Sequence, residues 1–160
     1  LVPLVFGFGA PLVAMVGSNV GAGHRDRALH IAWVGSAFSF AICETIGLTA
    51  AAFPSAWLRL FDSDATMIAT GAEYLRYVGP FYGFFGAGLA LYFASQGAGR
   101  LLWPLLGGFV RMVVAVLGGW LALKATGSLA VFFLTLGLAM LLYGVIVAAS
   151  IWRGVWFKGR

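Results

Sequence analysis

The sequence predicts an all-α fold, a polytopic membrane helix bundle with five transmembrane helices. Of its 160 residues, 62% are apolar and only 9% are charged, so a water-soluble domain of this composition would lack polar residues for its surface. Five apolar runs, each near the roughly 20 residues that cross a bilayer, are separated by short polar segments. Lipid offers backbone groups no hydrogen bonds, so each run is expected to form a continuous helix.

The expected spans, in order, are residues 1–18, 31–53, 77–95, 101–123 and 129–151. Pro54 and Ser55 stop the second span, because proline cannot continue a helix. Asp62, Ser63 and Asp64 offer N-cap oxygens to a helix that runs into the third span. The chain opens inside an apolar run with no Met or basic flank, so we expect it to be the C-terminal part of a longer polypeptide.

Basic residues in the loops predict the orientation, because Lys and Arg are enriched on the cytoplasmic side of a membrane. One side of the bundle receives most of them, namely Arg25, Arg27, Arg100, Arg153, Lys158 and Arg160. The other side receives Arg59, Arg76 and Lys124. We therefore expect the C-terminus in the cytoplasm, and we interpret the net charge of +5 as attraction to anionic lipid. No basic stripe interleaved with aromatics supports nucleic-acid binding.

Tryptophans near the ends of the spans are expected to anchor the chain in the headgroup layer. They are Trp57, Trp103, Trp120, Trp152 and Trp156. The single cysteine, Cys43, excludes a disulfide framework and a cysteine-based metal site, and His24 and His30 lack the partner spacing of a metal site. We expect no cofactor and no metal. There is no nucleophile and base constellation either, so an enzyme is not predicted.

A Gly-Ala-Gly motif occurs in two of the hinges between spans, at Gly21-Ala22-Gly23 and at Gly97-Ala98-Gly99-Arg100. Glycines permit left-handed turns and close backbone approach, as a tight hairpin between membrane helices requires. A phosphate-binding loop is rejected, because no strand precedes the glycines and no Lys-Ser or Lys-Thr follows them. The recurrence suggests an internal repeat. Asn19 and Gln96, beside the glycines, are expected to bond within the hairpins and to hold the gate together.

The sequences around these hinges resemble motifs of a known protein family. Residues 16–28, VGSNVGAGHRDRA, resemble the helix-end motif of the multidrug and toxic compound extrusion (MATE) family. Residues 54–61 resemble the external proline and Leu-Phe stretch of that family, and residues 74–76 with Pro80 resemble its next helix start. Residues 94–100, with Pro104 and Arg111, resemble the following hairpin. The similarity covers nearly the whole chain.

The resemblance implies that the five spans are the last five of a twelve-helix transporter. Residues 1–160 would then be part of the C-terminal lobe, with the N-terminal lobe and the first helix of this lobe outside the sequence. The implied function is secondary active efflux of amphipathic, cationic compounds, in exchange for sodium ions or protons, by alternating access of two lobes. The expected partners are organic cations, membrane lipid and the missing N-terminal lobe, and the expected location is a bacterial inner membrane.

Two charged side chains fall deep within predicted spans, where ionisable groups are costly and mark functional sites. Glu44, near the middle of the second span, would bind a proton, a sodium ion or a cationic substrate, or would be a protonated or paired structural residue. Arg111, about ten residues into the fourth span, would snorkel, bond within the lobe, or pair with Glu44 across comparable depth. If Glu44 is not the coupling residue, an acidic residue of the missing lobe would be.

An aromatic cluster follows Pro80, consisting of Phe81, Tyr82, Phe84 and Phe85. A kinked helix bearing several rings would line a cleft for flat cations through cation–π attraction, or its rings would face lipid and neighbouring helices. Tyr82 is the best substrate candidate, because its hydroxyl needs a partner.

Two alternatives to efflux remain open from the sequence. A lipid-linked sugar flippase of related architecture would need several cationic side chains in its cleft to hold a pyrophosphate. A non-transporting membrane scaffold would exist as a polypeptide of about this mass, near 17 kDa.

Overall fold

The computed structural model describes residues 2–61 and 63–157, and this part of the chain contains helices and no strands. The α-helices are α1 (Val2–Gly21), α2 (Arg25–Ala52), α3 (Pro54–Leu58), α4 (Ala65–Val78), α5 (Tyr82–Gly97), α6 (Leu102–Val113), α7 (Gly119–Thr126) and α8 (Leu129–Trp152). A 3-10 turn (Gly79–Phe81) joins α4 to α5, and a π-helical turn (Val114–Gly118) joins α6 to α7. A last 3-10 turn, Val155–Phe157, follows α8.

Five helical stretches are long and apolar enough to cross a membrane, which confirms the predicted fold class. They are Val2–Gly21, Arg25–Ala52, Ala65–Gly97, Leu102–Thr126 and Leu129–Trp152. Two of them start well before the apolar runs that predicted them. The helix at Ala65 begins after its N-cap Asp64, and the helix at Arg25 begins directly after the first glycine hinge, with no side-chain cap. The Asp64 carboxylate accepts a hydrogen bond from the backbone N–H of Met67 at 2.7 Å, as predicted for this N-cap. Asp62 lies outside the described residues.

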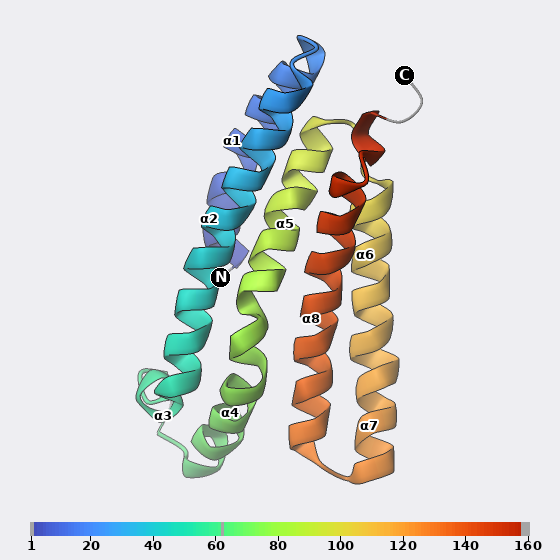
Figure 1. The fold of residues 1–160 in the computed structure, drawn as a ribbon. Helices are drawn as coiled ribbons and strands as arrows, with labels where there is room; N and C mark the ends of the chain where they lie inside the picture. Colours follow the sequence, from blue (N-terminus) through green and yellow to red (C-terminus); the bar gives the residue numbers. More distant parts are fainter. Residues whose placement is uncertain (1, 62, 158–160) are drawn as a thin grey trace.

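The helices run side by side, and the chain reverses at two opposite ends of the bundle (Figure 1). The turns after α1 and α5 lie at one end, together with the end of α8. The segment around α3 and the α7–α8 turn lie at the other end. Arg25, Arg100 and Arg153 therefore share what we call the hinge end, as the loop pattern predicted; Lys158 and Arg160 lie outside the described residues.

Helix α5 packs against α1, α2 and α8 through small residues. A Cβ added to Gly97 would lie 2.5 Å from the carbonyl oxygen of Val13 in α1, and one added to Gly79, in the turn that leads into α5, would lie 2.6 Å from that of Gly47 in α2. A Cβ at Gly144 of α8 would overlap the Phe84 carbonyl. Glycine is therefore required at these crossings, because packing between membrane helices depends on close backbone approach.

The C-terminal turn folds back into the core at the hinge end. After Gly154, whose φ is 73°, the indole of Trp156 is 4% exposed and donates to Ser95 Oγ at 3.2 Å. The guanidinium of Arg25 lies 5.0 Å from the ring centre of Phe157. The predicted interfacial role of Trp156 is therefore wrong, because a left-handed glycine turns its side chain inward. Trp152, which is 85% exposed, remains placed as an anchor would be.

Candidate functional site

The two glycine hinges have the same backbone geometry. Gly23 and Gly99 both adopt left-handed conformations, with φ of 80° and 69°. In the first hinge the N–H of His24 donates to the Asn19 carbonyl at 2.8 Å; in the second the N–H of Arg100 donates to the Ser95 carbonyl at 2.9 Å. In each hinge the N–H of the left-handed glycine also donates to the carbonyl three residues earlier, at 3.1 Å, which makes both hinges Schellman helix ends. The repeated Gly-Ala-Gly motif thus adopts the same local structure in both hinges.

The two helices that enter these hinges also touch each other. A Cβ on Gly17 of α1 would lie 3.2 Å from the Gly97 carbonyl oxygen of α5. The side-chain amide of Asn19 donates to the Met15 carbonyl at 2.8 Å, one turn earlier in α1, rather than to a group in the hinge. The side chain of Gln96 is exposed, and its backbone carbonyl accepts a hydrogen bond from the N–H of Gly99 at 3.1 Å.

Glu44 meets the beginning of α5. Its Oε2 accepts a hydrogen bond from the backbone N–H of Gly83 at 2.8 Å. Gly83 is the second residue of α5, where N–H groups have no acceptor within the helix and the helix dipole favours negative charge. Glu44 of α2 is therefore a cap supplied from a neighbouring helix, within a membrane-spanning segment.

Pro80 explains why a helix begins there. It has no N–H and lies in the 3-10 turn that separates α4 from α5, so the spanning segment 65–97 is interrupted inside the bundle. The gap between Gly83 and α2 is narrow, because a Cβ on Gly83 would lie 2.6 Å from Glu44 Oε2 and 2.9 Å from the Phe40 ring. Carboxylate, proline and glycine thus form one unit, which we call the α5 cap.

A cavity of about 420 Å³ lies beside this unit. Tyr82 and Phe85 line it from α5, Ile46 and Ala50 from α2, and Met140 from α8; Val2, Trp57 and Leu75 complete it. The hydroxyl of Tyr82 donates to that of Tyr74 at 3.5 Å, at the long limit of a hydrogen bond. The cavity is thus apolar and aromatic, with a phenol pair near it.

The predicted aromatic cluster divides between the cavity and the helix contacts. Phe81 packs on Gly137 of α8, and Phe84 meets Phe40 edge to face with ring centres 5.2 Å apart. Tyr82 and Phe85 line the cavity instead. Consecutive helical positions point in different directions, so four adjacent rings cannot line one cleft.

Arg111 has aromatic neighbours. Its guanidinium carbon lies 5.2 Å from the ring centre of Phe85 and 5.7 Å from that of Tyr143, distances typical of cation–π contacts. Its Nε is buried and has no hydrogen-bond acceptor among the described residues. Arg111 therefore lies against the rings of Phe85 on α5 and Tyr143 on α8 inside the bundle.

The ion pair between Glu44 and Arg111 is not formed. Glu44 accepts from the N–H of Gly83, and the Arg111 guanidinium lies over the ring of Phe85, two residues further along α5, so the two charges are at comparable depth. They are separated sideways instead, because α5 and α8 lie between α2 and α6 (Figure 1). Each charged group therefore contacts its own neighbours on α5 rather than the other charge.

Comparison with protein families decides what kind of chain carries these features. A family model described as MatE matches residues 1–121, which include both hinges, Glu44, the α5 cap and Arg111. The chain belongs to the MatE family. Membership makes it part of a membrane transport protein, and the predicted resemblance is confirmed. Comparisons with curated proteins and with solved structures found no match.

Some contacts of this MatE chain were not predicted from its sequence. Gly83 was not singled out, and Tyr74 and Ser95 were named only within motif stretches, yet these three contact Glu44, Tyr82 and Trp156 respectively. A signal for Gly83 was present, since it stands three residues after a proline within a spanning segment. No cluster of three His, Cys, Asp or Glu suited to a metal ion occurs in the part of the chain that the structure describes.

Proposed function

We propose that this chain is the C-terminal part of a secondary active exporter of amphipathic organic cations. The match of the MatE family to residues 1–121 carries the proposal, since that family transports compounds across membranes. In the proposed protein an N-terminal lobe completes the transport path, and the two lobes alternate access to it. The expected location is a bacterial inner membrane, with the hinge end and the C-terminus in the cytoplasm.

The substrate would occupy the cavity of about 420 Å³ beside Tyr82 and Phe85. Aromatic rings attract flat cations by cation–π interaction, and the apolar lining suits the hydrophobic part of such molecules. The Glu44 carboxylate of α2 accepts a hydrogen bond from the N–H of Gly83, the residue that follows Tyr82 in α5. It is the carboxylate in this lobe that we propose to exchange a proton or a sodium ion.

Coupling would act through the α5 cap. An ion that engages the Glu44 carboxylate competes with the Gly83 N–H, and it changes how firmly the start of α5 is held against α2. Because α5 also forms part of the cavity, occupancy of Glu44 and of the cavity would be linked.

The flippase alternative is less well supported. A pyrophosphate would need several cationic side chains together, and Arg111 has Phe85 and Tyr143 as its neighbours instead. A non-transporting scaffold is disfavoured by family membership.

The test is export of a fluorescent organic cation by everted vesicles that contain the full-length protein, energised separately by a proton gradient and by a sodium gradient. We expect export under one gradient. Glu44→Gln retains an acceptor for the Gly83 N–H but loses the charge, so we expect it to abolish export while the protein stays folded. Export retained in Glu44→Gln would move coupling to the other lobe, and no export under either gradient would contradict the proposed function.

A further inference from the structure

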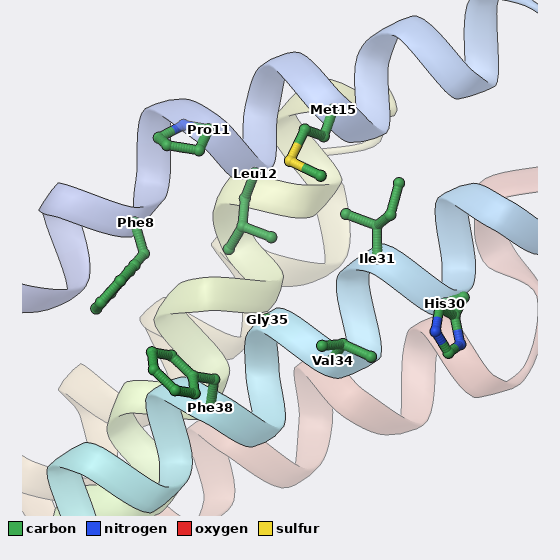
Figure 2. Close-up of a pocket in the computed structure, with 9 residues that line it drawn as sticks. All are labelled: Phe8, Pro11, Leu12, Met15, His30, Ile31, Val34, Gly35 and Phe38. Atoms are coloured by element: carbon green, nitrogen blue, oxygen red, sulfur yellow. The ribbon is translucent and has the colours of Figure 1, made fainter.

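A groove of about 270 Å³ runs between α1 and α2 on the outside of the bundle, away from the cavity at Tyr82. Figure 2 shows its lining, with Met15 and Phe8 reaching from α1 and Val34 and Phe38 from α2. These four side chains are between 37% and 56% exposed. The groove therefore belongs to the apolar surface of two membrane-spanning helices and is open along its length.

The floor of the groove is formed where the two helices touch. Leu12 packs directly over Gly35, where an added Cβ would lie 2.5 Å from Leu12 Cδ2. Phe8 and Phe38 meet edge to face at 5.5 Å between ring centres, at the end of the groove remote from the hinges. Rings thus narrow the deep end, and the opposite end leads toward the α1–α2 hinge.

That opposite end is basic. Among the described residues that line the groove, His30 is the one ionisable side chain, and it stands at the end toward the hinge (Figure 2). Arg27 lies three residues earlier in α2, so it shares a helical face with His30 and Val34. Arg27 also lines an open pocket at the hinge with His24, Arg25 and Asp26, whose carboxylate offsets part of the positive charge.

We propose that this groove holds one acyl chain of an anionic phospholipid, with the phosphate against Arg27 and His30. The apolar groove along the two spanning helices matches the acyl chain of such a lipid, and the basic end of the groove matches its phosphate headgroup. Basic pockets between transmembrane helices bind anionic headgroups, and a zwitterionic lipid would lack the net charge that Arg27 attracts. A helix of another polypeptide would satisfy the apolar lining but would not account for the charge at its end.

The test is photo-crosslinking in nanodiscs. The purified full-length protein is placed in phosphatidylcholine nanodiscs that contain a trace of phosphatidylglycerol bearing a photoreactive acyl chain, and the labelled peptides are mapped by mass spectrometry. We expect labels on residues 8–15 and 31–38. Val34→Trp fills the groove from an exposed position, so it is expected to abolish that labelling. Arg27→Gln is expected to lower the preference for phosphatidylglycerol over a photoreactive phosphatidylcholine about fivefold, the effect of roughly one surface charge.

Two variants serve as controls. Val116→Trp adds the same bulk at another exposed position, and Lys124→Gln removes a charge near the opposite end of the bundle; both are expected to leave the labelling unchanged. Equal capture of the two lipids by the unmodified protein would overturn the proposal. Labelling of the groove that survives Val34→Trp would also overturn it. An absence of labels from the groove would overturn it too, and would show that protein rather than lipid covers these residues.

Discussion

At the scale of single residues, the α5 cap is where charge, backbone and close packing meet. Glu44 alone would be a carboxylate in an apolar helix, which is expensive unless it is paired. The structure supplies the backbone N–H of Gly83 at 2.8 Å, and it does so because Pro80 ends one helix and starts another. A residue without a Cβ at position 83 leaves the space that the carboxylate occupies.

Gly83→Ala tests this unit. The new methyl group would lie 2.6 Å from Glu44 Oε2 and 2.8 Å from Glu44 Cβ, so the carboxylate must move away from the α5 N–H. We expect a loss of about 1–3 kcal/mol of stability, as for overpacking of a tight interior, and a loss of export. Thermal unfolding in detergent and vesicle transport measure the two effects.

Gly108→Ala is the matched control, because a Cβ there meets no atom within 4 Å. We expect this control to be neutral or slightly stabilising, since alanine favours helix over glycine. If Gly83→Ala behaved like Gly108→Ala, the close contact between α5 and Glu44 would not exist in the protein.

At the scale of elements, the hinges and the C-terminal turn hold one end of the bundle together. Both hinges end a helix in a left-handed glycine, and the helices that enter them touch at Gly17 and Gly97. The turn Val155–Phe157 then inserts Trp156 beside Ser95, at the end of α5. Side chains of α1, α2, α5 and α8 share one buried cluster with Trp156.

Trp156→Phe is expected to lower stability by about 1–3 kcal/mol, because Ser95 is fully buried and loses the indole N–H that donates to it. Limited proteolysis of the C-terminal segment and thermal unfolding would report the loss. Ser95→Ala added to Trp156→Phe should cost less than the sum of the two single changes, since both remove the same hydrogen bond.

Trp152→Phe provides the comparison at the same end of the bundle. Its side chain is 85% exposed, so we expect almost no change in stability or in proteolysis. Equal effects of the two tryptophan substitutions would mean that Trp156 is not inserted in the core.

At the scale of the whole molecule, the positions of the turns between the helices define two ends of the bundle, and the charges at these ends predict its orientation in the membrane. Both hinges and the end of α8 lie together, and the α7–α8 turn lies opposite (Figure 1). The hinge end carries Arg25, Arg27, Arg100 and Arg153. The excess of basic residues there favours a cytoplasmic location.

Cysteine labelling tests this orientation. Cys43 is fully buried, so the protein offers a nearly silent background for a membrane-impermeant maleimide. We expect His24→Cys to be labelled from the cytoplasmic side and Ser128→Cys from the external side in intact cells and everted vesicles. Labelling of both positions from one side would contradict the helix count, and the reverse pattern would contradict only the orientation.

The sequence by itself determined the membrane class, the five spans and the hairpin turns. These depend on properties that are local along the chain: hydropathy over about 20 residues, proline, and glycines at left-handed positions. The family motif at the first hinge was readable for the same reason, since its residues are contiguous. The N-cap at Asp64 was also predicted, because the residue it bonds is three positions away.

Only the tertiary structure decided which residues meet. Glu44 and Gly83 lie on different helices, and so do Ser95 and Trp156; no periodicity relates them. The pairing of Glu44 with Arg111 is not formed although both contact neighbouring residues of α5, because α5 and α8 lie between α2 and α6. Polar partners in a membrane bundle are set by how helices cross, and crossings depend on small residues whose neighbours the linear sequence does not specify.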